Sequence, residues 1–333
     1  MKPLLKNILI SGIVTVTCLF FMAAGLHAAT LRVLSPANNS FVEHELLSIV
    51  LSLQDGNATA VKAVVNGKTY TKTLAEGGSS KIVCFGVNLV NGSNRIVITA
   101  ANDSGEIGKS NVSIYLRSRL SKPHQQPPAG FQRYYFHLPA NEGACAPCHR
   151  MEADLNDLHP AKPEDSPCFK CHKRKDSSVF KHKPVSAGAC FSCHEVVTGK
   201  RKYTTPKPEQ SICFLCHSTQ QNLWKNKKVH HGPTAVGNCT VCHDPHGSDW
   251  PSFIYMHPTD LCLNCHNDKK SGLHVIAGFF AKGHPVRGDK NPLKPERPFS
   301  CAGCHNPHAG DTQSLLNKER GNNSAYCQTC HKL

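Results

Sequence analysis

The stretch His231-Gly-Pro-Thr-Ala-Val-Gly-Asn-Cys239-Thr-Val-Cys242-His243 ends in a pentapeptide, Cys-x-x-Cys-His (CxxCH), which occurs eight times between residues 145 and 331. Sixteen of the 18 cysteines fall in these copies. Two thiols at this spacing reach the two vinyl groups of one haem, and the adjoining imidazole is placed to bind the iron from one face. The motif therefore predicts eight covalently attached haems c.

We number the motifs as sites 1 to 8 in chain order. The cysteines predicted to attach haem are Cys145 and Cys148 (site 1), Cys168 and Cys171 (site 2), Cys190 and Cys193 (site 3), Cys213 and Cys216 (site 4), Cys239 and Cys242 (site 5), Cys262 and Cys265 (site 6), Cys301 and Cys304 (site 7), and Cys327 and Cys330 (site 8). The corresponding proximal iron ligands are His149, His172, His194, His217, His243, His266, His305 and His331.

Structural zinc sites are the main alternative for paired cysteines, because Cys-x-x-Cys is also a zinc-binding spacing. Zinc does not require a histidine directly after every second cysteine, and histidine makes up only 21 of the 333 residues. A histidine after all eight pairs is therefore explained by haem attachment and not by zinc or by a disulfide framework.

A second ligand for each iron is expected from the remaining histidines, because only 4 methionines occur in the chain. Ligation by two histidines implies lower reduction potentials than ligation by histidine and methionine. No spare histidine lies between His194 and Cys213, so we keep His230 as a substitute donor. The distal candidates are His137, His159, His182, His231, His246, His257, His284 and His308.

The CxxCH region contains an internal repeat. Three sites share the pattern His-x-Pro-x-x-x-Gly-x-Cys-x-x-Cys-His, which begins at His137, His182 and His231, and a looser form begins at His284. These sites alternate with sites that lack the leading pattern. Four tandem dihaem units, together an octahaem domain over residues 137–333, are the natural description.

The rest of the chain predicts a different domain and an export signal. Residues 1–29 have the charged start, apolar run and small residues of a signal peptide, and the length of the apolar run leaves a retained membrane anchor as the alternative. Residues 30–118 predict an antiparallel β-sandwich, from six apolar segments separated by turn residues. These strands are expected at 31–34, 46–53, 61–70, 81–89, 95–100 and 111–116. Residues 119–136 predict a Pro-rich linker.

The formal net charge of +15 would ordinarily suggest an anionic partner. Here the haem propionates supply the negative charge, so nucleic acid is not expected as a partner. The basic runs, among them Lys200-Arg201-Lys202, are expected to lie partly beside propionates and partly in solvent.

The repeat, together with Cys242-His243-Asp244-Pro245-His246 and Cys304-His305-Asn306-Pro307-His308, resembles the doubled-CxxCH multihaem cytochromes of metal- and sulfur-respiring bacteria. The segment from Asn88 to Leu116 resembles the closing strands of bacterial immunoglobulin-like domains. The expected fold is thus an immunoglobulin-like all-β sandwich followed by a haem-dominated domain of coil and short helices.

The resemblance implies an electron carrier rather than an enzyme, with no catalytic residues, in the periplasm or at the outer cell surface. The implied partners are other c-type cytochromes and an outer-membrane porin–cytochrome conduit. Two alternatives stay open. One is a reductase of nitrite, hydroxylamine or a sulfur oxyanion, which needs one haem with an open face. The other is a self-assembling conductive filament.

Overall fold

The computed structural model describes residues 30–54, 57–75, 80–117, 126–143, 145–154, 157, 160–170, 172, 175, 177–196, 201–270, 284–317 and 327–331. The predicted signal peptide and two predicted site residues, Cys171 and His159, lie outside these ranges. In the described part of the chain, no helix has the length and apolar character that crossing a bilayer requires.

The N-terminal region consists of two β-sheets that share one hydrophobic core. One sheet has the strand order β1-β3-β6, and the other has the order β5-β4-β7-β8-β2-β9. The strands are β1 (Thr30–Ser35), β2 (Ser40–Val42), β3 (Leu46–Gln54), β4 (Ala60–Val65), β5 (Lys68–Thr73), β6 (Ser80–Asn88), β7 (Gly92–Asn102), β8 (Gly105–Leu116) and β9 (Gln132–Arg133).

The core of the sandwich follows from the alternation of apolar residues along its strands. On β7, Ile96, Ile98 and Ala100 point inward and are fully buried, while the residues between them are more exposed. Leu51 on β3 and Ile114 on β8 close the same cluster from the two sheets. A strand with one face in the core requires this period of two residues.

Removing one methyl group from the core of the sandwich should lower the stability of this domain measurably. Ile98 is fully buried, so Ile98→Val should lower the free energy of unfolding of this domain by about 0.5–1.5 kcal/mol. Thermal unfolding followed by far-ultraviolet circular dichroism would measure the change. Ile82→Val is the matched control, because Ile82 on β6 is 46% exposed and its truncation should change stability little.

One predicted strand is two strands in the structure. The expected strand 61–70 is divided into β4 and β5, which pair as a hairpin around Asn66 and Gly67. Both turn residues have positive φ, 49° and 82°. An Asn-Gly pair tolerates this conformation and matches the twist of the flanking strands, which is why the chain reverses here.

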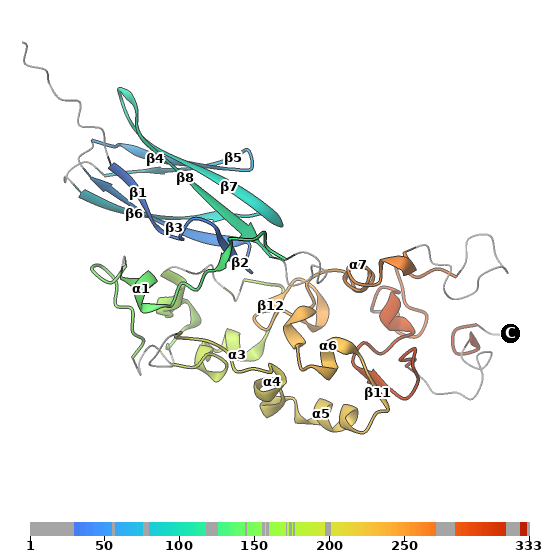
Figure 1. The fold of residues 1–333 in the computed structure, drawn as a ribbon. Helices are drawn as coiled ribbons and strands as arrows, with labels where there is room; N and C mark the ends of the chain where they lie inside the picture. The colour runs from blue at the N-terminus through green and yellow to red at the C-terminus, as the bar shows by residue number, and fades with distance from the viewer. Residues whose placement is uncertain are drawn as a thin grey trace, which may run out of the picture.

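The chain that follows the sandwich returns to its edge. Strand β9 pairs in parallel with β2, and the amide of Tyr134 donates to the Phe41 carbonyl at 3.0 Å. Glu43 forms ion pairs with both Arg117 at the end of the sandwich and Arg133 in β9. Gln132 and Arg133 belong to the segment predicted as a linker, and they form the sixth strand of the larger sheet. The start of the CxxCH region is therefore held against the sandwich, as Figure 1 shows.

Residues 137–333, which we call the CxxCH region, contain short helices joined by coil. Figure 1 shows this region running from beneath the sandwich, at α1, to the C-terminus. Its helices are α1 (Pro139–Glu142), α3 (Lys183–Ser186), α4 (Gln210–Cys216), α5 (Ser218–Lys225), α6 (Gly232–Ala235) and α7 (Pro258–Leu263). Its 3₁₀ turns are η1 (Pro163–Asp165), η2 (Pro167–Lys170), η3 (Cys190–Ser192), η4 (Cys239–Val241), η5 (Pro251–Phe253), η6 (Asn267–Lys269) and η7 (Cys301–Gly303).

Its strands are two residues long and occur in pairs: β10 (Phe180–Lys181) with β12 (Gly247–Ser248), and β11 (Val229–His230) with β13 (Ala309–Gly310). The predicted fold class, an all-β sandwich followed by coil with short helices, is confirmed in its architecture. The finer assignment of the sandwich as immunoglobulin-like stays a prediction.

Candidate haem-binding sites

All eight CxxCH motifs have the same local geometry. In each one the amide of the histidine donates to the carbonyl of the first cysteine, four residues earlier, at 2.9 to 3.2 Å. This bond closes a single helical turn. In the seven motifs whose two cysteines the structure describes, cysteines three residues apart are thereby placed on one side of the turn, and the histidine follows on the same side.

Six histidines that follow CxxCH cysteines each face a second imidazole from a distant part of the chain. The ring centroids of every pair lie 6.0 to 6.2 Å apart. Each pair joins one proximal and one distal candidate. The pairs are His172 with His137 (site 2), His194 with His246 (site 3), His217 with His182 (site 4), His243 with His308 (site 5), His266 with His231 (site 6) and His331 with His284 (site 8).

This separation fits one iron atom between two imidazoles. A metal–nitrogen bond of about 2 Å, as for zinc, plus roughly 1.1 Å from nitrogen to ring centroid, predicts a centroid separation of about 6.2 Å. Parallel rings in face-to-face contact lie closer, as the Trp224 indole does to the His308 ring, at 4.3 Å, whereas edge-to-face contacts such as Phe191 with Tyr203 also reach 6.0 Å. Within the described ranges no three metal-binding side chains converge as a zinc site requires.

Hydrogen bonds at Nδ1 leave the other ring nitrogen available for metal. The Nδ1 atoms of His182, His194 and His243 bond to the carbonyls of Pro245, Tyr203 and Ser252, at 2.7 to 2.8 Å. A carbonyl only accepts, so the proton is on Nδ1 and the lone pair is on Nε2. Such second contacts fix the tautomer and the ring orientation of metal-binding histidines. In five of the six pairs at least one imidazole has Nδ1 bonded to an oxygen acceptor, and in the sixth the His231 ring bonds to the Pro307 backbone.

The carbonyl that accepts from the proximal histidine has a constant position in three of the units. It belongs to the ninth residue after the histidine at sites 3, 5 and 7: Tyr203, Ser252 and Ser314. A β-bridge between the motif and the returning chain, such as His243 with Ile254, closes this loop each time. The loop was not predicted, since its residues share no obvious pattern.

Burial lowers the pKa of several facing imidazoles. Burial first, and the facing imidazole second, lower the pKa of His172 and of His308 to about 4. The same two causes contribute to lowering the pKa of His231, whose facing ring is His266. At neutral pH these rings are uncharged and carry the lone pair that a metal requires.

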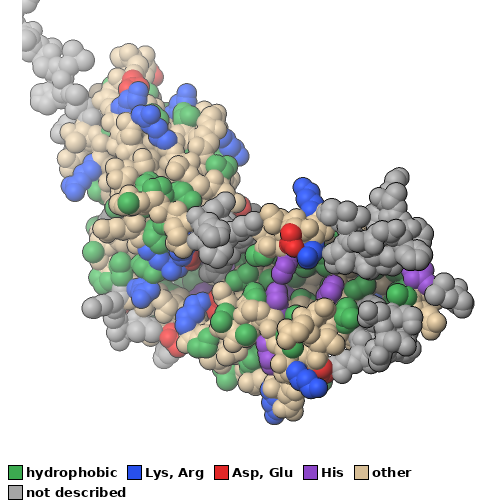
Figure 2. All heavy atoms as spheres, turned by 45° about the vertical axis from the view of Figure 1, so that its right-hand side comes forward, with side chains coloured by type: hydrophobic (Ala, Val, Ile, Leu, Met, Phe, Trp, Pro, Cys, Tyr) green, Lys and Arg blue, Asp and Glu red, His purple; other side chains and the backbone are tan. Residues whose placement is uncertain are grey.

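The CxxCH region lacks a hydrophobic core of its own. Among the described residues, the buried hydrophobic side chains outside the sandwich are Cys145 and Ala309. Large apolar side chains such as Leu215, Leu223 and Val236 are instead 63 to 76% exposed. Figure 2 shows histidine side chains inside a hollow of this region, with hydrophobic side chains along it. The donors and the apolar lining together fit haem groups as the missing core.

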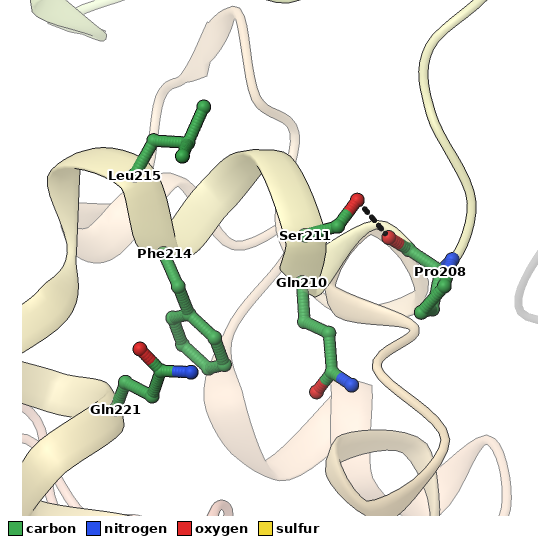
Figure 3. A pocket seen from close by; sticks show the side chains of 6 residues that line it. All are labelled: Pro208, Gln210, Ser211, Phe214, Leu215 and Gln221. Atoms are coloured by element: carbon green, nitrogen blue, oxygen red, sulfur yellow. Dashed lines mark hydrogen bonds between the residues drawn. The ribbon is translucent and has the colours of Figure 1, made fainter.

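A cavity of about 360 Å³ lies beside site 4, between α4 and α5. Phe214, one of the two residues between Cys213 and Cys216, points into it together with Gln210 and Gln221 (Figure 3). Leu215, the other residue between the cysteines, also lines the cavity. Both residues between the site 4 cysteines therefore contribute apolar lining to it.

The two short ladders bring distal candidates of neighbouring sites together. In the pair β10–β12, His182 directly follows β10 and His246 directly precedes β12. The His182 amide donates to the His246 carbonyl at 3.4 Å. The pair β11–β13 does the same for His231 and His308, at 3.0 Å. One ladder therefore positions an imidazole for site 3 and one for site 4, and the other does so for sites 5 and 6.

Contacts between cysteine side chains connect the neighbouring sites that the ladders do not connect. The side chain of Cys213 at site 4 contacts Cys239 at site 5, and this contact is the main cause that raises the pKa of Cys213. The corresponding contact between Cys262 at site 6 and Cys301 at site 7 raises the pKa of Cys262. Consecutive sites are therefore adjacent from site 3 to site 7.

A buried ion pair supports the imidazole at site 2. Glu142, 4% exposed, accepts from His137 Nδ1 at 2.9 Å and from the Lys202 ammonium at 2.6 Å. Burial alone would lower the pKa of Lys202, but the carboxylates of Glu142 and Glu152 raise it. Lys202 was predicted to lie near propionates or in solvent. Lys202 is 8% exposed and does not lie in solvent, because its ammonium pairs with Glu142 and Glu152. Both partners are distant from it in sequence, so no local pattern predicted this burial.

Several predicted site residues are outside the six pairs. His149 and His305 are the proximal candidates of sites 1 and 7. His257 caps α7, and its Nδ1 accepts from the Thr259 amide, which places the proton of the neutral ring on Nε2. This is the opposite tautomer to the paired rings. His230 lies in β11, while His182 occupies the position at site 4 for which His230 was the substitute.

Three of the facing pairs have the same spacing in the sequence, which the repeat pattern alone did not reveal. His137, His182 and His231 each lie 35 residues before their facing histidine, His172, His217 and His266. The leading histidine of a unit therefore faces the second CxxCH histidine of the same unit.

Comparisons with solved structures bear on the sandwich. A part of this chain is similar to fibronectin(III)-like modules of Clostridium thermocellum CbhA, at 17% identity over 27% of this chain and 98% of that one, with a TM-score of 0.21. A Cellulomonas fimi endo-beta-1,4-mannanase matches 26% of this chain and 18% of its own, at 15% identity and a TM-score of 0.19. Scores this low assign the sandwich to neither family.

The CxxCH region has clearer relatives. A multiheme cytochrome, MtrA of Shewanella baltica (strain OS185), is 28% identical over 102 residues, which are 31% of this chain and 26% of that protein. The aligned part thus spans about a quarter of the relative's length. The family model described as "Doubled CXXCH motif" matches residues 182–222, 231–271 and 292–333, which contain sites 3 to 8. Such paired motifs attach haem c covalently, and over these residues the chain matches the doubled-CxxCH family and is similar to a multihaem cytochrome.

Proposed function

We propose that this chain is an octahaem c-type cytochrome that transfers electrons along a row of bis-His haems in periplasmic or extracellular respiration. The observation that carries the proposal is the set of six imidazole pairs. Each combines one CxxCH histidine with one histidine from elsewhere, at the separation that a single iron requires. Haem supplies one-electron exchange, and the protein supplies the two ligands and the surroundings that set each potential.

The contacts between consecutive sites support a continuous path. Ladders connect sites 3 and 4 and sites 5 and 6, and cysteine contacts connect sites 4 and 5 and sites 6 and 7. At site 2, Cys168 is close enough to Cys190 of site 3 to contribute to its raised pKa, after burial. Groups attached at these cysteines would lie next to one another along the chain.

The location and the partners follow from the same proposal. Haem is attached to thiols outside the cytoplasm, so the protein would be exported by residues 1–29 and act in the periplasm or at the outer surface. Electron exchange between cytochromes uses small, transient interfaces. We propose other c-type cytochromes, including those of an outer-membrane porin–cytochrome conduit, as the donor and the acceptor.

The holoprotein tests the proposal directly. Mass spectrometry should show eight attached haems. Electron paramagnetic resonance of the oxidised protein should show low-spin iron throughout, and carbon monoxide should leave the optical spectrum of the reduced protein unchanged. Six-coordinate iron with two histidines has no position for carbon monoxide. A high-spin signal together with a carbon monoxide adduct would show that at least one haem lacks a second histidine ligand. That result would favour a reductase with one open haem.

A further inference from the structure

Two units of the repeat contain the same loop with one chemical difference. Site 5 continues as His243-Asp244-Pro245-His246, and site 7 continues as His305-Asn306-Pro307-His308. Asp244 Oδ1 accepts from the His246 amide at 3.0 Å, and Asn306 Oδ1 accepts from the His308 amide at 3.0 Å. The amides of Asp244 and Asn306 each donate to a returning carbonyl at 2.7 Å.

The difference lies at the imidazole. Asp244 Oδ1 also accepts from His246 Nδ1, at 2.9 Å, so an anion is hydrogen-bonded to this ring. In the described structure no hydrogen bond joins the Asn306 side chain to the His308 ring. That ring instead stacks on Trp224, with centroids 4.3 Å apart and planes at 11°. One distal candidate therefore has a carboxylate behind it, and the other has a neutral indole.

A carboxylate at this place has a known physical effect. Its hydrogen bond makes the imidazole a stronger electron donor, which stabilises the more positive oxidation state of the metal. Its negative charge acts in the same direction through space. Asp244 is 31% exposed, so water screens part of the charge, but the hydrogen bond does not depend on that screening.

We propose that Asp244 gives the site 3 haem, between His194 and His246, a lower reduction potential than the site 5 haem, between His243 and His308. This inference rests on the proposed function, because it needs both pairs to be iron ligands. Electrons that enter the row occupy site 5 in preference to site 3. The Asp/Asn difference directly after the proximal histidine thus creates an energy step within the row.

Reciprocal substitution tests the inference. Asp244→Asn should move one midpoint potential of the holoprotein to a more positive value, and Asn306→Asp should move a different one to a more negative value. Potentiometric titrations followed by optical absorption and by the low-spin resonances would measure both. The loop should persist in both variants, because Asn306 already forms the same backbone contact that Asp244 forms. Unchanged potentials in Asp244→Asn would overturn the inference.

Ligand variants separate this inference from the proposed function. His246→Ala and His308→Ala should each produce one high-spin haem. If His246→Ala leaves every haem low-spin, the ligand pair at site 3 is wrong, and both proposals fail there. If His246→Ala produces a high-spin haem while Asp244→Asn changes no potential, the bis-His row stands and only the role of Asp244 is lost.

Discussion

Replacing His182 with alanine should convert one low-spin haem into a high-spin haem that binds carbon monoxide. His182 faces His217 at 6.1 Å, and its Nδ1 donates to the Pro245 carbonyl at 2.7 Å, so Nε2 is directed at site 4. Without it, the iron at this site keeps only its proximal ligand. Resonance spectra and carbon monoxide titration should show one changed haem, with the others unaffected.

His230 provides the control for this variant. It lies one residue before His231 in β11 and is outside the six imidazole pairs. His230→Ala should therefore leave every haem low-spin. The opposite outcome, a high-spin haem in His230→Ala and none in His182→Ala, would show that His230 is the ligand at site 4.

Replacing Gly247 with alanine should disrupt two sites at once. Gly247 has a φ of +127°, and a β-carbon there would lie 2.4 Å from the Phe180 carbonyl oxygen and 3.1 Å from the Lys181 Cα. Both atoms are backbone of β10, so the ladder has to separate. With strain of about 1–3 kcal/mol at such a φ, plus the clash, we expect the CxxCH region to lose more than about 2 kcal/mol of stability.

The ladder carries His182 and His246, so its separation should loosen the distal ligands of sites 3 and 4 together. The expected readout is high-spin character at two haems and a lower unfolding temperature. Gly232→Ala is the control, because a β-carbon at Gly232 meets no atom within 4 Å. A Gly247→Ala protein with the spectrum and unfolding temperature of the unaltered chain would show that β10 and β12 do not position these ligands.

What the sequence predicts well is what a few adjacent residues determine. Each CxxCH turn depends on one hydrogen bond between residues four apart, and the structure forms it at all eight motifs. Long-range pairing is a different problem. His308 faces His243 from 65 residues away, across site 6 of the same unit and site 7 of the next, and no local pattern indicates this pair.

The same distinction holds for the sandwich and for its junction. Alternating apolar residues predicted most strands. Because β-branched residues lie on both sides of Asn66-Gly67, a single strand was predicted where the structure has a hairpin. The proline-rich composition predicted a linker over residues 119–136, yet Gln132 and Arg133 within it form a strand beside β2. The burial of Lys202 depends on Glu142 and Glu152, which no local pattern connects to it.

The placement of the ladders also determines how this chain can be divided or extended. Each ladder joins the start of one unit to the loop of the next, so the sequence repeat and the complete site do not coincide. A segment cut out as one repeat keeps the facing pair His182 and His217, but it leaves His194 without His246. The boundaries between the second and third units and between the third and fourth each pass through a site, so these units are not interchangeable, and a shortened or duplicated chain keeps its complete sites only if neighbouring copies complete one another.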